Sequence, residues 1–133
     1  MDWKLEVVVV PVSDVDRAKQ FYVDQVGFNL DVDHRGAGDM RVVQTTPPGS
    51  GCSVTFGTGL AAMEPGSLKG LQLVVADVEA ARSELESRGV EVTPVRHMGE
   101  NGWADGPGGD WNSFVFFDDP DGNSWAIQQK PAS

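Results

Sequence analysis

The chain has 133 residues, of which 40% are hydrophobic, and this length suits one globular domain with a buried core but not two full domains. Twenty Asp and Glu residues against ten Lys and Arg residues give a net charge of -10 at pH 7. This charge disfavours binding to nucleic acid or to anionic lipid, because like charges repel. The composition therefore predicts a neutral or cationic partner, or no role for the charge beyond solubility.

The cysteine content and the first residues bear on the cellular compartment. The single cysteine, Cys52, excludes an internal disulfide, and no Cys/His cluster has zinc-finger spacing. The chain begins MDWKLEVVVVPV, in which an acidic residue comes early and Pro11 interrupts the apolar run. This start predicts neither a signal peptide nor a membrane span, so we expect a cytoplasmic protein.

The first half of the chain predicts a strand, a helix and three further strands. The Val-rich segment 5–12 is short and predicts a strand buried on both faces or nearly so. Asp14 is suited to cap a helix, apolar residues recur at helical spacing as far as Gln25, and Gly27 ends the pattern. The further strands are expected over residues 28–33, 41–45 and 52–57.

The second half repeats this order. Residues 71–75 predict a strand, Asp77 a helix N-cap, and Gly89 the helix end, with more strands over 90–95, 113–117 and 124–129. The two halves match at a constant offset, which indicates a duplicated module. We therefore predict an α+β fold of tandem βαβββ modules in a single domain. Module one spans about 1–60, a linker about 58–69, and module two about 70–133.

The segment FDDPDGNSWAIQQ, residues 117–129, carries three aspartates around a Pro and a Gly. It does not fit an EF-hand, because Gly122 comes too early and no Glu stands at the twelfth position. Pro120 and Asp121 suit the two corners of a type I turn, and Gly122 supplies a left-handed residue. We expect a turn between antiparallel strands, in which Asp119 accepts backbone N–H groups.

The segments VVVVPVSDVDRAKQFYVDQVGF and FFDDPDGNSWAIQQ resemble the vicinal oxygen chelate superfamily. This superfamily includes glyoxalase I, extradiol dioxygenases, fosfomycin-inactivating enzymes and bleomycin-resistance proteins, and the resemblance covers nearly the whole chain. It implies the glyoxalase/bleomycin resistance fold, in which each module curls a mixed sheet into half of a cup with the helices outside. It also implies a homodimer, with ligand clefts between modules of one or both chains.

The resemblance further implies four metal-ligand positions on inward-facing strands. In this chain they are occupied by Val7, Thr55, Gly70 and Ala126. A divalent metal of this kind needs imidazole or carboxylate ligands, so we predict no metal and no cofactor. A shift of one residue would bring Glu6 to the first position, but that shift also turns the side chain to the opposite face of the sheet.

Few other residues could carry chemistry. His34 lies in a polar turn and His97 follows a predicted strand, and we interpret both as surface or packing residues, with His97 the better candidate for a general base. Cys52 is expected to be a small buried side chain rather than a nucleophile. The segment PPGSGCS lacks the Lys-Ser/Thr of a phosphate loop. We therefore assign no catalytic residue.

The predicted cup has an apolar wall with a few neutral hydrogen-bonding groups, because side chains alternate along each strand. The loop 97–112 adds Trp103 and Trp111 among five glycines. Exposed indoles are costly in water, so they should cover a ligand, the dimer interface or the protein's own core. The predicted ligand-binding residues are Val7, Val9, Thr55, Gln72, His97, Trp103, Trp111, Phe114, Phe116, Ala126 and Gln128.

The other two tryptophans are assigned structural roles. Trp125 alternates out of phase with Ala126 and should pack under a helix, and Trp3 is expected to be structural as well.

These features lead to a functional prediction. We expect a metal-free, homodimeric binding protein that sequesters a planar or polycyclic aromatic antibiotic of bleomycin, mitomycin or enediyne type in a dimer-interface cleft and so confers resistance. The alternative is a metalloenzyme of the same superfamily, a glyoxalase-type lyase or a dioxygenase, with a displaced metal site built from His97, Glu6 or Glu64. A third alternative is a metabolite-binding or scaffold domain without a role in resistance.

Overall fold

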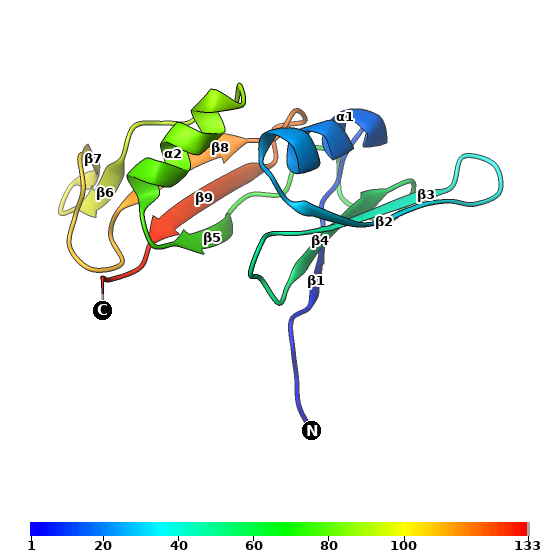
Figure 1. Ribbon diagram of the computed structural model, residues 1–133, viewed down its shortest axis with the longest axis horizontal. Helices are drawn as coiled ribbons and strands as arrows, with labels where there is room; N and C mark the ends of the chain where they lie inside the picture. Colours follow the sequence, from blue (N-terminus) through cyan, green and yellow to red (C-terminus); the bar gives the residue numbers. More distant parts are fainter. Residues whose placement is uncertain (133) are drawn as a thin grey trace. The chain divides into compact units, whose positions relative to one another are not determined.

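The computed structural model describes residues 1–132, which form two compact units. The first unit contains Met1–Leu68 and Asp119–Asn123, and the second contains Lys69–Asp118 and the chain from Ser124 onward. Each unit has one mixed sheet and one helical segment (Figure 1). The α+β class predicted from the sequence is therefore confirmed. Neither helical segment in the described part is long and apolar enough to cross a membrane.

The sheet of the first unit has the strand order β1-β4-β3-β2. β1 (Val7–Val9) runs parallel to β4 (Ser53–Gly57), and β3 (Arg41–Thr46) pairs antiparallel with both β4 and β2 (Asn29–Arg35). The three later strands lie close to their predicted positions. β1 is an edge strand of this sheet.

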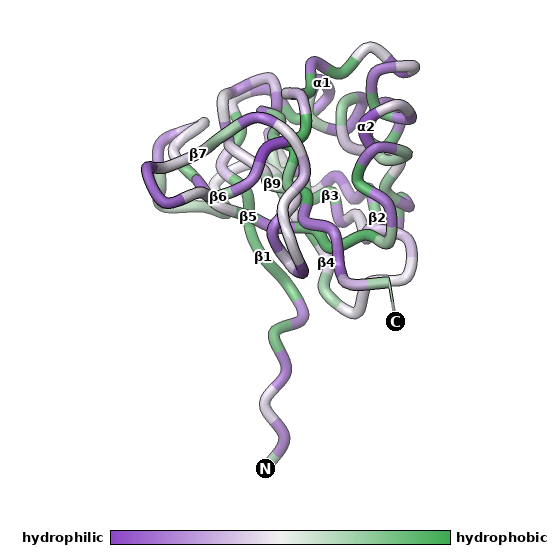
Figure 2. The backbone as a smooth tube through the Cα atoms, turned by 90° about the vertical axis from the view of Figure 1, so that its left-hand side faces the viewer, coloured by the Kyte–Doolittle hydropathy of each residue, from purple (hydrophilic) through white to green (hydrophobic). Residues whose placement is uncertain are grey.

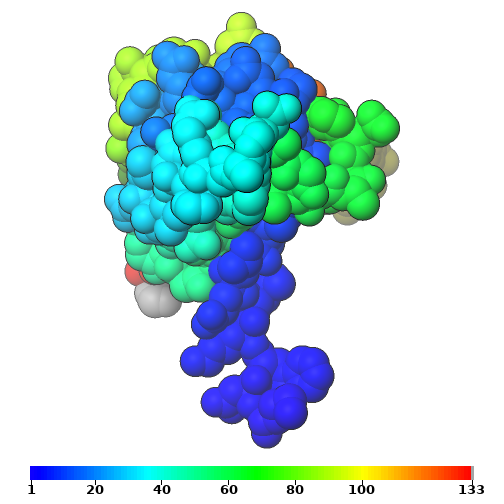
Figure 3. All heavy atoms as spheres, turned by 90° about the vertical axis from the view of Figure 1, so that its right-hand side faces the viewer, coloured from blue at the N-terminus to red at the C-terminus, as the bar shows by residue number. Residues whose placement is uncertain are grey.

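The start of the chain differs from the prediction. The strand expected over residues 5–12 spans only Val7–Val9, and it is not buried on both faces, since Val7 is 49% exposed. Trp3, which was expected to have a structural role, is 86% exposed. The physical reason is that residues 1–6 project away from the rest of the first unit (Figures 2 and 3).

The first helical segment begins where the sequence predicts. The Asp14 side chain accepts a hydrogen bond from the Arg17 N–H and caps α1 (Val15–Lys19). The segment then continues as a π-helix, η1 (Gln20–Gln25), which the sequence did not indicate. It ends before Gly27, which has a φ of 94°.

The core of the first unit is centred on Tyr22, which is fully buried. Its ring lies 5.2 Å from Phe21, 5.8 Å from Phe28 and 5.5 Å from Phe56. Such aromatic clusters supply much of the apolar burial in a small unit. The Tyr22 hydroxyl donates to Asp119 Oδ2 over 2.6 Å, so the polar end of this buried side chain has a partner.

Charged side chains tie the first helix to the sheet. The Arg41 guanidinium, 8% exposed, donates from Nε and Nη2 to the two carboxylate oxygens of Asp33, each over 3.0 Å, and from Nη1 to Asp16. Lys19 Nζ donates to Asp33 over 2.7 Å. The hydrogen bond from Arg41, and then that from Lys19, lower the pKa of Asp33 well below its usual range.

The second unit has the strand order β5-β9-β8-β6-β7. β5 (Leu71–Val75) runs parallel to β9 (Ser124–Gln129), which pairs antiparallel with β8 (Phe114–Asp118). β6 (Arg96–Gly99) pairs with β8 at one residue and forms a hairpin with β7 (Gly102–Asp105). The predicted bounds of β5 and β9 agree with the structure.

Two predictions in this unit were wrong. Residues 90–95 form no strand, because Pro94 lacks the N–H that a strand ladder needs, although the Thr93 N–H still donates to Phe116 O. The segment expected to be a loop, 97–112, instead contributes most of the β6–β7 hairpin. Gly102, with a φ of 108°, makes the tight turn of this hairpin possible.

The helix of the second unit covers one face of its sheet. Asp77 caps α2 (Val78–Ser87) by accepting from the Ala80 N–H, as predicted. Figure 1 shows α2 lying across β8 and β9. Trp125 is 3% exposed and stacks on Phe117 with ring centroids 5.9 Å apart, so its predicted burial is confirmed.

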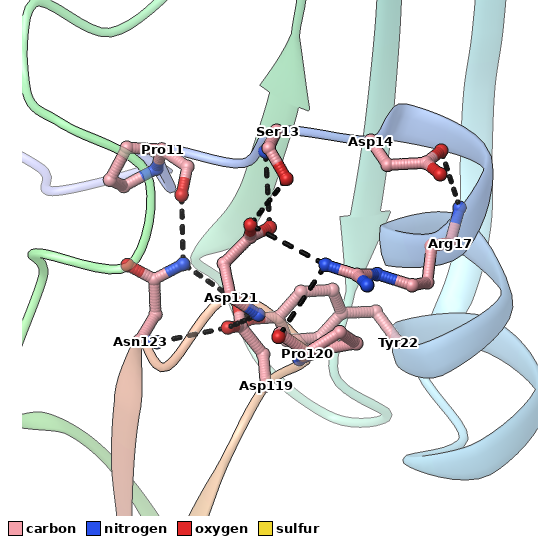
Figure 4. A network of polar contacts seen from close by, with 9 residues as sticks. All are labelled: Pro11, Ser13, Asp14, Arg17, Tyr22, Asp119, Pro120, Asp121 and Asn123. Carbon is pink, nitrogen blue, oxygen red and sulfur yellow. Dashed lines mark hydrogen bonds and ion pairs between the residues drawn. The ribbon is translucent and has the colours of Figure 1, made fainter.

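The turn that joins β8 and β9 belongs to the first unit by its contacts. The Gly122 N–H donates to Asp119 O, and Asp119 Oδ1 accepts from the N–H groups of Asp121 and Asn123, which confirms the predicted turn (Figure 4). Asn123 is fully buried and donates through Nδ2 to Asp119 Oδ2 and to Pro11 O. The aspartates therefore form a turn and its hydrogen bonds.

Replacing the buried turn carboxyl should destabilise the protein strongly. Asp119→Ala removes an acceptor that is 5% exposed, and with it the hydrogen bonds donated by the Tyr22 hydroxyl, the Asn123 amide and two backbone N–H groups, so we expect a loss of about 3 kcal/mol or more in the free energy of unfolding. Tyr22→Phe should cost about 1.5 kcal/mol. The control is Asp118→Ala at the neighbouring exposed carboxylate. Urea unfolding that finds the two alanine variants equally stable would contradict this role.

The ion pairs of Asp33 predict a pH dependence of stability. A lowered pKa in the folded state means that the stabilisation is fully present above the unfolded pKa, about 4, and is lost as pH falls toward the folded value. Asp33→Asn should therefore cost about 1.5 kcal/mol or more at pH 7, with a difference from wild type that shrinks below about pH 4. Denaturant unfolding at several pH values measures this. Asp24→Asn, at an exposed carboxylate, is the control.

Candidate functional site

An open cavity of about 560 Å³ lies within the second unit. Its volume falls in the range of small-molecule sites. Strands β5, β7, β8 and β9 and the segment before β8 supply most of its wall. The lining residues are Gly70, Gln72, Met98, Trp103, Trp111, Asn112, Phe114, Phe116 and Ala126.

Three aromatic rings form one wall of this cavity. Phe114 and Phe116 project from the same face of β8, and their rings lie 6.1 Å apart and nearly parallel. Trp103, from β7, meets both edge-on, with centroids 5.2 Å and 5.1 Å away. Trp103 is nevertheless 48% exposed. The cluster therefore offers a large apolar surface that the second unit itself leaves open.

Trp111 stands at another part of the wall in an unusual backbone conformation. Its φ is 61°, and no other non-glycine residue in the described part of the chain has a positive φ. Such a conformation costs about 1–3 kcal/mol and persists only where neighbouring contacts hold it. The next residue, Asn112, is anchored to the hairpin, because its Oδ1 accepts from the Met98 N–H over 2.8 Å and its Nδ2 donates to Met98 O over 3.0 Å.

Two glutamine side chains, joined by a hydrogen bond, hold the Trp111 carbonyl directly. Gln128 Nε2 donates to Trp111 O over 2.7 Å, and Gln72 Nε2 donates to Gln128 Oε1 over 2.7 Å. Since a carbonyl oxygen only accepts, the orientation of both amides follows from Trp111 O. Gln72 Oε1 is left as an acceptor that bonds to nothing in residues 1–132.

The structure brings six of the predicted ligand-binding residues together. The residues that line the cavity are Gln72, Trp103, Trp111, Phe114, Phe116 and Ala126. Gln128 does not line it but holds Gln72 and Trp111. The His97 side chain is half-buried, and its Nδ1 lies 2.9 Å from Gly106 O, so this ring is part of the hairpin's own packing.

The other three predicted residues lie in the first unit. Val7 and Val9 are on β1, and Thr55 is on β4 opposite Val9. None of them is among the lining residues of this cavity. Thr55 is buried, and its hydroxyl has no hydrogen-bond partner among the described residues. As ligand contacts these three residues remain predictions.

Three lining residues were missed: Gly70, Met98 and Asn112. Met98 pairs across the hairpin with Trp103, and paired residues share a face of a sheet. A correct prediction of the β6–β7 hairpin would therefore have found it. Nothing in the neighbouring sequence indicates Asn112, because its hydrogen bonds depend on where the folded hairpin places Met98.

The residues present do not fit the metal that the superfamily implies. Two of the four expected ligand positions, Gly70 and Ala126, line the apolar cavity and offer no donor atom in their side chains. Within residues 1–132, no three His, Cys, Asp or Glu side chains gather closely enough to hold a metal ion. Glu6, Glu64 and His97, the residues of the proposed displaced site, accordingly form no such group.

A second hollow, of about 340 Å³, lies in the first unit. Its charged lining residues include Asp16, Arg35 and Arg41. Asp16 is paired with both arginines, so these charges satisfy one another. This hollow is better explained by the ion pairs around Arg41 than by a ligand.

Comparison with known proteins agrees with this fold. The model of the glyoxalase/bleomycin resistance protein/dioxygenase superfamily matches residues 4–127. The chain belongs to this superfamily. The resemblance noted in the sequence is therefore confirmed, although the superfamily contains both enzymes and binding proteins.

Similar proteins, two of them of known structure, match nearly the whole chain. TnmS3, an antibiotic binding protein from Streptomyces sp. CB03234, is 37% identical, with 98% of each chain covered and a TM-score of 0.78. A glyoxalase/bleomycin resistance protein from the same strain is 38% identical over 95% of this chain and 100% of its own, with a TM-score of 0.74. YetH from Bacillus subtilis (strain 168), an uncharacterized protein, is 26% identical over 95% of this chain and 98% of its own length.

Proposed function

We propose that the protein is a non-enzymatic binding protein that sequesters a planar aromatic antibiotic in the cavity of the second unit and thereby confers resistance. The observation that carries this proposal is the open aromatic wall of Trp103, Phe114 and Phe116, facing a cavity large enough for a drug-sized molecule. The similarity to the antibiotic-binding TnmS3 supports it. The bound compound is of the bleomycin, mitomycin or enediyne type, and the site lies in a cleft that a second copy completes.

The wall is suited to hold a conjugated ring system. A flat ring laid against the exposed indoles of Trp103 and Trp111 removes apolar surface from water on both partners. Each aromatic contact adds about 0.5–1.5 kcal/mol beyond the area term. These gains require no reactive group, so the binding is explained without catalysis.

The cavity lining supports sequestration over turnover. None of its nine residues has a side chain that titrates, so the lining provides no general acid, general base or ionised nucleophile. The negative charge of the whole chain, -10, favours a neutral or cationic guest. Glu100, Asp105 and Asp110 flank the two tryptophans in the sequence and add to this preference.

The hydrogen-bonded side chains of Gln72 and Gln128 favour a ligand that carries a hydrogen-bond donor. Gln72 Oε1 is an acceptor in the cavity wall, and its orientation follows from the contacts of Gln128 and Trp111. A guest hydroxyl or N–H can donate to it, whereas an ether or a tertiary amide cannot. We therefore place a hydrogen-bond donor at the edge of the bound ring system.

Calorimetric titration of the purified full chain against bleomycin-, mitomycin- and enediyne-type compounds tests the proposal. At least one compound should bind with micromolar or lower Kd, quench tryptophan fluorescence, and be recovered unchanged by mass spectrometry. Trp103→Ala should weaken binding about tenfold or more, because it removes one ring contact and its buried area. Met63→Ala, at an exposed apolar residue of the first unit, is the control. Turnover of the compound, or one tightly bound divalent metal per chain, would support the enzyme alternative.

Analogues of a compound that binds test the role of Gln72. Methylation of the donor group should weaken binding to wild type about fivefold, since a single hydrogen bond contributes about 1 kcal/mol. The same methylation should have little effect on the Gln72→Leu variant, because the acceptor is already absent. An equal loss in both proteins would show that the donor group does not contact Gln72.

A further inference from the structure

One arginine of the second unit, Arg96, differs from the others in having no carboxylate partner. Each of the other arginines forms an ion pair with a carboxylate: Arg17, Arg35, Arg41, Arg82 and Arg88. Within residues 1–132, the Arg96 side chain takes part in no ion pair, hydrogen bond or ring contact, although acidic residues outnumber basic ones two to one. Arg96 is nevertheless half-buried. A partly desolvated charge is costly without a partner, so its guanidinium is available to an anion.

Arg96 lies on the cavity face of the sheet, beside the aromatic wall. On β6 it stands directly opposite Phe114 of β8, and opposite residues of an antiparallel pair share a face. Met98, two positions further along β6, is on the same face, and both Phe114 and Met98 line the cavity. The Cβ atoms of opposite residues are about 5 Å apart, a distance that the long arginine side chain can span. The guanidinium is therefore within reach of a ligand that lies against Phe114.

Asp105 does not neutralise this charge. It lies opposite Arg96 in the β6–β7 hairpin, yet the two side chains form no ion pair in the described part of the chain. Asp105 is exposed, and an ion pair in that position contributes little, because water screens it. A ligand anion that the aromatic wall shields from water can therefore compete with Asp105 for the guanidinium.

We propose that Arg96 is a specificity-determining residue of the binding site, and that the ligand carries an anionic oxygen, a carboxylate or a phenolate, at one end of its ring system. This inference rests on the proposed function, because it assumes that the ring lies against the aromatic wall. Arginine suits this role, since its planar guanidinium donates two parallel N–H bonds to a carboxylate. The net charge of -10 repels an anion at a distance, but salt screens that repulsion beyond about 10 Å, whereas it leaves a shielded contact largely intact.

The site then has two different polar ends. Gln72, on β5, offers an acceptor, whereas Arg96, on β6, offers only donors. Strands β9 and β8 lie between them, so three inter-strand spacings, roughly 14 Å, separate the two residues. A polycyclic ligand therefore binds in one orientation, with its hydrogen-bond donor toward β5 and its anionic group toward β6.

Two probes that differ in charge test the role of Arg96: anthracene-2-carboxylate and its neutral carboxamide. Each is titrated against the full chain at pH 7 and followed by the fluorescence of the anthracene. Arg96→Met keeps the apolar stem and should weaken binding of the carboxylate about tenfold or more, while the amide stays within about twofold. Arg96→Lys should retain most of the carboxylate affinity, because it retains the charge. Arg88→Met, at an ion-paired arginine of α2, is the control and should change neither affinity.

Removal of the opposite carboxylate gives a second readout. Asp105→Asn should strengthen binding of the carboxylate probe about two- to threefold and leave the amide unchanged, because it removes a competing and repelling charge. Weaker carboxylate binding in this variant would show that Asp105 and Arg96 act as a structural ion pair, and would overturn the proposal.

The two probes also separate this proposal from the proposed function. Carboxylate binding that is unchanged in Arg96→Met, or an equal loss for both probes, would overturn the role of Arg96 but leave the aromatic wall as a binding site. Failure of the wild type to bind either probe would overturn both.

Discussion

A buried carboxyl group, that of Asp119, holds the first unit together. With 5% of its surface exposed, it accepts hydrogen bonds from the Tyr22 hydroxyl, from two backbone N–H groups of its own turn and from the Asn123 amide. A buried polar group is tolerable only when it is satisfied in this way. Asn123 in turn donates to Pro11 O and accepts from the Leu68 N–H. This one turn therefore joins two segments that are distant from it in the sequence.

Much of this fold could be predicted from local patterns. The caps at Asp14 and Asp77 and the turn at Pro120 could be recognised because each depends on residues within a few positions. The β6–β7 hairpin was missed because its glycines and polar residues have the composition of a loop, and its pairing becomes apparent only from the register. The exposure of β1 was missed for a related reason, since a Val-rich run does not show whether a partner strand covers it.

The candidate site was partly predictable for the same reasons. Alternation along β8 correctly placed Phe114 and Phe116 on one face, and Ala126 on the paired strand followed from it. Alternation cannot say which residues of separate sheets line one cavity, and Val9 and Thr55, which lie in the other unit, are not among the lining residues of this one. The backbone of Trp111 was not predictable, because nothing in its own residue type indicates a positive φ.

The conformation of Trp111 bears on the energetics of the proposed ligand binding. The Gln128 amide bonds to the Trp111 carbonyl, and the next residue, Asn112, is anchored to Met98, so the backbone at Trp111 is held without any ligand. The conformational entropy of ordering this backbone is therefore lost during folding. A ligand that binds beside Trp111 does not incur that cost a second time.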